Sequence, residues 1–309
     1  MKRYLLLLVL IVPISVVAQG SRWVTNDCSS GEGTGTYTWA NGETYEGQCL
    51  NERLNGQGTL FMANGDRYVG HWQRDLQNGQ GTYFWANGDR YEGQWRDGAQ
   101  DGDGTFTQAN GDRYVGQWTN RRKNGRGMLT LANGERYDGD WLQDQITGSG
   151  SYDWPNGDRF EGQWDNGRQN GRGVMQRTNG DRYEGQYQDN RRHGSGIYSW
   201  SNGDRFEGQW ENGRQNGNGV KFWANGDSYE GQVKDDQLNG HGIFTWANGN
   251  RFEGQFQNDA INGTGSFFWT NGERYVGLWS DGQRDGPGTF YDAEGMEFEK
   301  LYRFGTSVD

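Results

Sequence analysis

The feature of this sequence that most restricts its fold is a motif that returns every 23 residues without an insertion or a deletion. The motif is most complete at Asn87–Trp95, where it reads Asn-Gly-Asp-Arg-Tyr-Glu-Gly-Gln-Trp. A fixed period of this length is typical of repeat architectures, in which each unit packs on the next. The aromatic column that marks the eleven copies consists of Tyr45, Tyr68, Tyr91, Tyr114, Tyr137, Phe160, Tyr183, Phe206, Tyr229, Phe252 and Tyr275.

Two turn signals divide each repeat into two strands. Asn-Gly stands in all eleven repeats, beginning with Asn41-Gly42, and this dipeptide favours a type I′ hairpin turn with positive φ at both positions. A second signal follows ten residues later, as at Asp97-Gly98. The predicted fold is therefore all-β: an elongated single twisted antiparallel sheet of about eleven consecutive 23-residue β-hairpin repeats.

The turn also predicts which residues share a face of the sheet. A two- or four-residue loop at Asn-Gly places Thr38 opposite Tyr45 and Trp39 opposite Thr44, whereas a three-residue loop would exchange the faces. With the first register, five tryptophans face arginines as cation–π pairs on the second face. These pairs are Trp85 with Arg90, Trp154 with Arg159, Trp200 with Arg205, Trp246 with Arg251, and Trp269 with Arg274.

The composition supports order and excludes one class of partner. Hydrophobic residues make up only 31% of the chain and glycines number 54, a composition that could indicate disorder. Disordered segments are poor in aromatic residues, however, whereas here these residues reach 15% and recur periodically. The net charge of −11 argues against nucleic acid as a partner, because binding to phosphates needs a basic surface. The same charge weakens attraction to anionic lipid.

The first residues have the layout of a secretory signal peptide. Lys2 and Arg3 form a basic start, an apolar run covers residues 5–12, and Val-Val-Ala ends at Ala18. We expect cleavage after Ala18, which makes the protein secreted or periplasmic. An uncleaved membrane anchor is the alternative, although the apolar run is short for a membrane span.

Two cysteines fit this oxidising location. Cys28 and Cys49 are a candidate disulfide that would hold the N-terminal end, and the alternative is two buried free thiols. We divide the chain into a signal peptide at residues 1–18, an N-terminal cap at 19–32, the repeat array at 33–295 and a C-terminal cap or tail at 296–309.

No motif predicts catalysis, and we expect neither a metal nor a cofactor. The three histidines His71, His193 and His241 fall in different columns of the repeat, which is not a metal-ligand spacing. A carboxylate recurs beside the Asn-Gly turn in nearly every repeat, so it is interpreted as a turn residue rather than as one of a glycosidase pair. No Gly-x-Ser-x-Gly nucleophile elbow occurs on a strand–helix turn.

The motif resembles a known family. Tyr-Glu-Gly-x-Trp-x-x-Gly-x-x-x-Gly-x-Gly, at Tyr91–Gly104 and Phe160–Gly173, is similar to the MORN (membrane occupation and recognition nexus) repeat, and the resemblance runs from about Gly33 to Phe298. It implies an elongated twisted sheet of hairpins that acts as a scaffold or binding module. In that family such arrays occur in junction-forming membrane proteins and beside lipid-kinase or methyltransferase domains, and some are linked to acidic phospholipids or to protein assembly.

The function that we expect is a non-enzymatic exported scaffold that presents an aromatic groove to a protein, a lipid membrane or a glycan. The alternative is a secreted carbohydrate-binding or carbohydrate-degrading surface protein. The same aromatic residues could instead pack between neighbouring repeats. Exposed strand edges at the two ends of the sheet would also permit a homo-dimer. The predicted groove residues are Tyr91, Trp95, Tyr114, Trp118, Tyr137, Trp141, Phe160 and Trp164.

Overall fold

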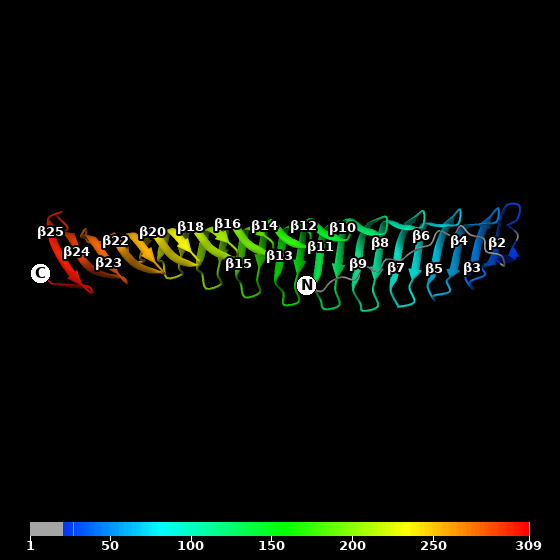
Figure 1. The fold of residues 1–309 in the computed structure, drawn as a ribbon, viewed down its shortest axis with the longest axis horizontal. Coiled ribbons are helices and arrows are strands. Elements are labelled where there is room, and N and C mark those ends of the chain that lie inside the picture. Colours follow the sequence, from blue (N-terminus) through cyan, green and yellow to red (C-terminus); the bar gives the residue numbers. More distant parts are fainter. Residues whose placement is uncertain (1–20, 27, 309) are drawn as a thin grey trace. The chain divides into compact units, whose positions relative to one another are not determined.

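The computed structural model describes residues 21–26 and 28–308, which form β-strands joined by turns in an open antiparallel sheet of 26 strands (Figure 1). This confirms the predicted all-β class and the hairpin repeat of about 23 residues. The predicted signal peptide at residues 1–18, with its cleavage site after Ala18, lies outside the described residues.

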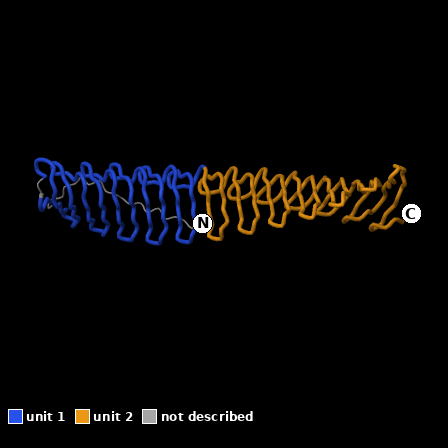
Figure 2. Tube along the Cα trace, turned by 180° about the vertical axis from the view of Figure 1, so that it is seen from behind, with its two compact units in different colours: residues 1–148 blue, residues 149–309 orange. Residues whose placement is uncertain are grey.

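The contacts within the chain divide it into two compact units, Met1–Gly148 and Ser149–Asp309 (Figure 2). The strands of the first unit are β1 Arg22–Asn26, β2 Glu32–Thr38, β3 Thr44–Leu50, β4 Arg53–Phe61, β5 Arg67–Gln73, β6 Leu76–Phe84, β7 Arg90–Arg96, β8 Ala99–Thr107, β9 Arg113–Thr119, β10 Arg122–Thr130 and β11 Arg136–Leu142. Residues of both units belong to β12 (Gln145–Asp153). The strands of the second unit are β13 Arg159–Asp165, β14 Arg168–Gln176, β15 Arg182–Gln188, β16 Arg191–Ser199, β17 Arg205–Glu211, β18 Arg214–Phe222, β19 Ser228–Lys234, β20 Gln237–Thr245, β21 Arg251–Gln257, β22 Ala260–Phe268, β23 Arg274–Ser280, β24 Gln283–Tyr291, β25 Glu297–Arg303 and β26 Thr306–Ser307.

Each repeat combines a seven-residue strand with a nine-residue strand, as in β7 and β8. Side chains of β7 alternate strictly between exposed and buried, so one face of the strand forms the interior and the other meets solvent. Within a unit, each strand pairs with the strands before and after it in the chain, as β7 and β9 pair with β8. Function must therefore be sought on the two faces of a single layer.

The Asn-Gly loop has three residues, and the predicted type I′ turn at this position is wrong. In the first loop the N–H of Gly42 donates to the carbonyl of Trp39 and the N–H of Trp39 donates to the carbonyl of Glu43, both at 3.0 Å. Only the glycine has positive φ, +90° at Gly42, which is typical of a type I turn followed by a glycine bulge. The same pair of bonds closes all eleven Asn-Gly loops.

The extra loop residue exchanges the faces relative to the prediction. Tyr37 lies opposite Tyr45, and Tyr83 lies opposite Tyr91. Arg90 lies opposite Phe84 rather than Trp85, so the predicted arginine–tryptophan pairs do not form in this register. Arginines of this column instead lie over phenylalanine and tyrosine rings of the exposed face, at 4.3 Å for Arg67 over Phe84.

Type I′ geometry occurs at the second turn of the repeat. Asp97 and Gly98 have φ of +46° and +77°, and they connect the paired residues Arg96 and Ala99. The mirror-image turn matches the twist of the flanking strands. It is adopted even where neither turn residue is a glycine.

A pair of glycines lets each tyrosine ring fold over the sheet. Gly93 lies opposite Gly104, and the ring of Tyr91 covers both. A Cβ on Gly104 would lie 2.3 Å from the Tyr91 hydroxyl oxygen, and a Cβ on Gly93 would lie 2.5 Å from the Cα of Gly104. No other residue leaves this space.

Candidate functional site

All eight predicted groove residues lie in the interior of the sheet. Their side chains are at most 7% exposed, and Tyr91 and Phe160 are fully buried. The expectation that they line an open groove is therefore corrected by the structure: the rings fill the space between neighbouring repeats. In order along the chain they are Tyr91, Trp95, Tyr114, Trp118, Tyr137, Trp141, Phe160 and Trp164.

The buried rings form a continuous edge-to-face ladder within a unit. Tyr91 contacts Trp95 of its own repeat and Trp118 of the next, each with ring centroids 5.3 Å apart and planes nearly perpendicular. The indole N–H of Trp95 donates to the carbonyl of Gly81 at 3.2 Å. Edge-to-face pairs contribute about 0.5–1.5 kcal/mol each beyond burial, so the ladder stabilises each repeat against its neighbours.

Burial raises the pKa of the tyrosines in the buried column. Desolvation raises the pKa of Tyr183 and Tyr229 to about 12, and that of Tyr91 further still. The hydroxyl of every tyrosine in this column except Tyr275 donates to a backbone carbonyl three residues on, as Tyr91 does to Gln94 at 3.0 Å. These phenols are therefore neutral structural donors and not acid–base groups near neutral pH.

Cations take part in the ladder at three repeats. The ammonium of Lys123 lies 5.0 Å from the ring centroids of both Tyr114 and Trp141, and burial lowers its pKa although Asp144 and Asp112 oppose this. Arg192 and Arg284 hold the equivalent place in their repeats. An aromatic box that could hold a ligand cation is thus filled by the chain itself.

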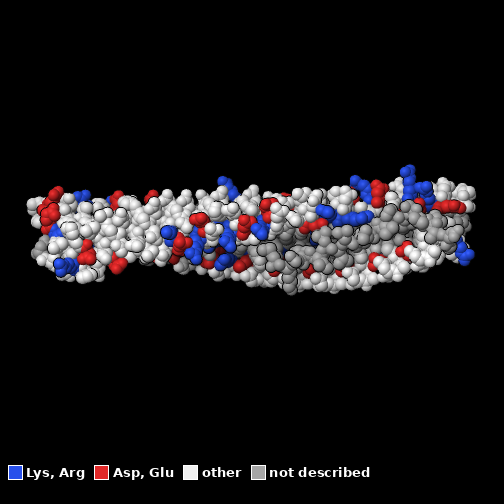
Figure 3. All heavy atoms as spheres, viewed as in Figure 1, with Lys and Arg blue, Asp and Glu red and all other residues white. Residues whose placement is uncertain are grey.

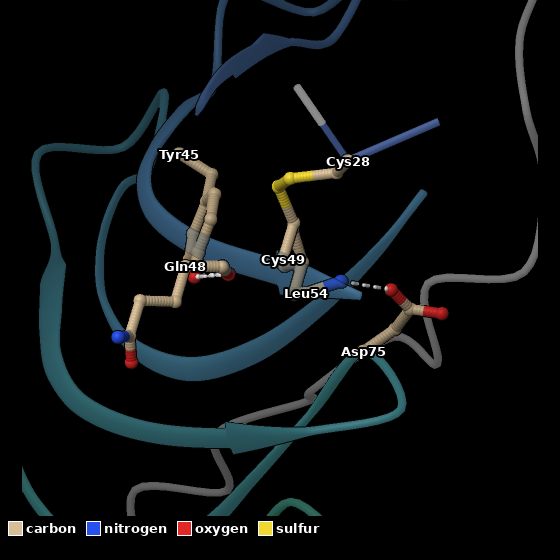
Figure 4. Close-up of a disulfide and its surroundings, with 6 residues drawn as sticks. All are labelled: Cys28, Tyr45, Gln48, Cys49, Leu54 and Asp75. Carbon is tan, nitrogen blue, oxygen red and sulfur yellow. Dashed lines mark hydrogen bonds between the residues drawn. A yellow bond between two sulfur atoms is a disulfide. The ribbon is translucent and has the colours of Figure 1, made fainter. Parts of the chain in front are cut away.

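The N-terminal end of the ladder is closed by a disulfide. Cys49 occupies the column that holds tryptophan in most repeats, and a disulfide joins it to Cys28, with a Cα–Cα distance of 5.7 Å (Figure 4). Both cysteines are buried. Trp23 adds an edge-to-face contact with Tyr45 at 6.4 Å, so the first tyrosine is covered on its outer side.

Where the recurrent acidic residue beside the Asn-Gly loop is aspartate, it ties one repeat to the next. The Oδ1 of Asp89 accepts from the N–H of Ala109 at 2.8 Å, and its Oδ2 accepts from Asn87 of its own loop at 3.0 Å. A backbone hydrogen bond of this kind, from Ala224, lowers the pKa of Asp204. Their reading as turn residues is consistent with these contacts.

The second unit carries an aromatic surface that packing leaves partly exposed. We use the name aromatic strip for six residues that lie on strands β20, β22 and β24 and in the loops that follow β18, β20 and β22. They are Trp223, Phe244, Trp246, Phe267, Trp269 and Phe290. Successive rings contact one another, with centroid distances of 5.3, 4.7, 5.1, 4.6 and 6.0 Å along the strip.

The phenylalanines of the strip lack a hydrogen bond that tyrosine makes at the same position in two other repeats. Tyr83 and Tyr198 hold the equivalent column in other repeats, and each is buried and donates to a turn carboxylate, Asp66 at 2.7 Å and Asp181 at 2.9 Å. Phenylalanine at 244, 267 and 290 has no hydroxyl and makes no such bond. The phenylalanines of the strip instead contact the neighbouring tryptophan rings.

Sequence reasoning assigned the strip tryptophans to the opposite face. Asn-Gly is compatible with both a two-residue and a three-residue loop, so the dipeptide alone does not fix the register. A usable signal was present, however. The column that contains Tyr37, Leu60 and Tyr83 is apolar in nearly every repeat, and only the three-residue loop places it on the same face as the buried tyrosines.

The opposite face carries exposed ion pairs of both signs. Arg182 pairs with Glu184 and Arg205 with Glu207, each at 2.6 Å, and Figure 3 shows blue and red side chains interspersed over this part of the second unit. Such exposed pairs contribute little to stability.

Titratable side chains line one hollow of the second unit without bonding to one another. A hollow of about 580 Å³ on the second unit is lined by His241, Glu253 and Glu299 among others, but the imidazole makes no hydrogen bond or ion pair with either glutamate. Within residues 21–26 and 28–308, no group of three or more metal-ligating side chains comes together. The same residues include no helix long and apolar enough to cross a membrane.

Comparison with protein families gives a match over most of the chain. The family described as MORN repeat matches twelve segments between residues 32 and 297. The first segment, 32–44, is short, and the other eleven are full repeats of the 23-residue period, starting at 45–67. Comparison with curated protein sequences found no match.

Solved structures give only distant likenesses. The TCP domain of SAS-4 from Drosophila melanogaster is 14% identical, with 58% of this chain and 97% of that domain covered and a TM-score of 0.35. The G-box domain of the microcephaly protein CPAP is 12% identical, with 77% and 99% covered and a TM-score of 0.24. Virginiamycin B lyase from Staphylococcus aureus is 8% identical, with 91% and 88% covered and a TM-score of 0.14, so it is a distant fold match only.

Proposed function

Since the chain belongs to the MORN repeat family, we propose that it is an exported, non-catalytic scaffold that holds a partner on its aromatic strip. The observation that carries this proposal is the strip itself. The six strip residues are partly exposed, lie on four consecutive repeats of the second unit and form an unbroken row of ring contacts. A contiguous aromatic surface of this kind is typical of an interaction site.

A scaffold role is supported by the hydrogen bonds that the recurrent polar groups of the repeat make. The tyrosines donate to backbone carbonyls, the tryptophans donate to glycine carbonyls, and the turn carboxylates accept from the next loop. These polar groups of the motif are thus used in bonds within the fold. A non-catalytic role is the simplest function for such a surface.

Export is supported by the disulfide and by the basic and apolar start of the chain. Disulfides persist in oxidising compartments and are rare in the cytosol. Cys28 and Cys49 are buried and joined across 21 residues, which suits a permanent structural bridge. We propose a secreted or periplasmic location on these grounds.

The proposal is tested by capture of partners with the purified protein. We expect that partners from the medium or cell envelope, trapped by cross-linking, are lost when Trp223, Trp246 and Trp269 are all changed to alanine. Trp154→Ala is the matched control, because Trp154 occupies the same loop position but is followed one repeat later by Arg177 instead of tryptophan. Capture that is unaffected by the triple change would refute the strip as the binding surface, and turnover of a captured glycan would refute a non-catalytic role.

A further inference from the structure

We infer that the aromatic strip is a track for a proline-rich peptide in the polyproline II conformation, with one proline seated at each of its three tryptophans. This inference rests on the proposed function and names the chemistry of the partner. It is carried by the spacing of the tryptophans, by their free indole donors and by the uncharged character of the strip.

The spacing of the tryptophans matches one turn of a polyproline II helix. Trp223 reaches Trp246 through Phe244 in steps of 5.3 and 4.7 Å, so their ring centroids are at most 10.0 Å apart. Trp246 reaches Trp269 through Phe267 in steps of 5.1 and 4.6 Å, which limits that distance to 9.7 Å. Two strand widths give about 9.6 Å, and three residues of polyproline II rise about 9.3 Å.

The fit distinguishes this conformation from a β-strand. An extended strand advances about 6.8 Å for each pair of residues that points to the same side. Side chains of such a strand would meet the tryptophans out of phase after one repeat. In polyproline II, every third residue returns to the same side of the helix, so prolines at positions 1, 4 and 7 meet three successive tryptophans.

The indole N–H groups of the strip are available to a ligand. No protein acceptor is assigned to the indole nitrogen of Trp223, Trp246 or Trp269 among the described residues, and none of these nitrogens is buried. In contrast, the buried indole of Trp279 donates to the carbonyl of Gly265 at 3.3 Å. Polyproline II has no internal hydrogen bonds, so its carbonyls can accept from such donors.

The surroundings of the strip favour an apolar, uncharged ligand. All six strip residues are uncharged, and each tryptophan is followed by a small exposed residue: Ala224, Ala247 or Thr270. Lys221 lies at one end of this row, with its ammonium 5.0 Å from the centroid of the Trp223 ring. Trp200 precedes Trp223 in the same column, but Lys221 stands between them where phenylalanine stands in the next three repeats, so the row of contacting rings begins at Trp223.

Aromatic grooves recognise polyproline II because the ligand is ordered before it binds and therefore loses little entropy. The strip would add to this a repeated contact, since one ligand can engage three tryptophans in register. Binding strength should accordingly depend on where the prolines lie in the peptide and not only on how many there are.

The test compares two uncharged, end-blocked peptides of ten residues with the same composition. In the first, proline occupies every third position, and in the second the prolines are consecutive. We expect the periodic peptide to bind the full-length protein about tenfold more tightly, measured by calorimetry and by the change in tryptophan fluorescence. Equal affinities for the two peptides would overturn the inference.

Variants assign the binding to the strip. Trp246→Ala should lower the affinity for the periodic peptide about tenfold, which is the scale of one lost aromatic contact. Trp154→Ala should change this affinity less than twofold. Trp246→Phe retains the ring and removes the indole donor, so it should weaken binding by an intermediate factor even if the alanine variant is less stable. Affinity that is the same in all three variants would overturn the inference.

Two further probes separate this inference from the proposed function. β-1,4-linked oligosaccharides and vesicles of neutral phosphatidylcholine are offered to the same variants. If either probe binds through the three strip tryptophans while the periodic peptide does not bind, the strip is a binding surface and the peptide inference is wrong. If partner capture is also independent of the strip, then both proposals fail.

Discussion

Individual residues of the motif are specialised for packing in a single sheet. A sheet without a covering layer must bury its rings against one another, and here the rings do so by folding over facing glycines. Tyr91, for example, covers Gly93 and Gly104 and then meets Trp118 of the next repeat. The glycine and aromatic columns are thus two halves of one arrangement, which explains why they recur together.

The buried tryptophans should therefore be required for stability. Trp118→Ala removes a side chain that is 6% exposed and contacts Tyr91 and Tyr114, so we expect a loss of about 3–5 kcal/mol. Trp85→Ala in the same unit removes a partly exposed ring and should cost clearly less. Urea unfolding followed by circular dichroism measures both, and similar losses for the two would contradict the assignment of Trp118 to the interior.

At the scale of the element, the two hairpin loops of each repeat have different geometries. The Asn-Gly loop has three residues and one positive φ, and the second loop has two residues and two positive φ values, as at Gln143 and Asp144. Both loops also bond to a neighbouring repeat, as Asp144 does when its Oδ1 accepts from the N–H of Lys123 at 2.9 Å. The loops therefore set the register of a strand pair and also link that pair to the neighbouring repeat.

The second loop offers a change that should stabilise the protein. Gln143 is exposed and has φ of +48°, a conformation that costs an ordinary residue about 1–2 kcal/mol. Gln143→Asn should recover about 0.5–1 kcal/mol, because asparagine is favoured in this turn and already stands at Asn166 and Asn212.

Thermal unfolding of the variants tests the loop assignment. Gln143→Val serves as the opposite control, since a β-branched residue is strained at positive φ and should destabilise the protein. If valine were tolerated as well as asparagine, the type I′ geometry assigned to this loop would be wrong.

At the scale of the whole molecule, stability is expected to be local. In a linear array each repeat interacts with its neighbours, so a change at one end affects that end most. The disulfide between Cys28 and Cys49 closes a loop of 21 residues at the N-terminal repeats. A cross-link of this size contributes about 3 kcal/mol.

Removal of the disulfide should loosen only the first strands. In the double variant Cys28→Ser and Cys49→Ser, we expect faster amide hydrogen exchange in β1 to β4 and unchanged exchange in the second unit. Intact mass of the exported wild type should show a chain that begins at Gln19 and carries no free thiol. Faster exchange throughout the chain would contradict local stability. An N-terminus that retains residues 1–18 would contradict export.

The sequence by itself determined the period, the strands, the turn positions and the columns that carry rings and glycines, because each of these depends on local backbone preference. It also placed Cys28 near Cys49 as a candidate pair. Tertiary structure decided which face each column occupies, because Asn-Gly by itself permits two loop lengths and one residue of difference reverses every side chain. Tertiary structure likewise decided that Tyr91 and Trp118 are buried while Trp223, Trp246 and Trp269 are partly exposed, since burial depends on what the neighbouring repeat places over each ring.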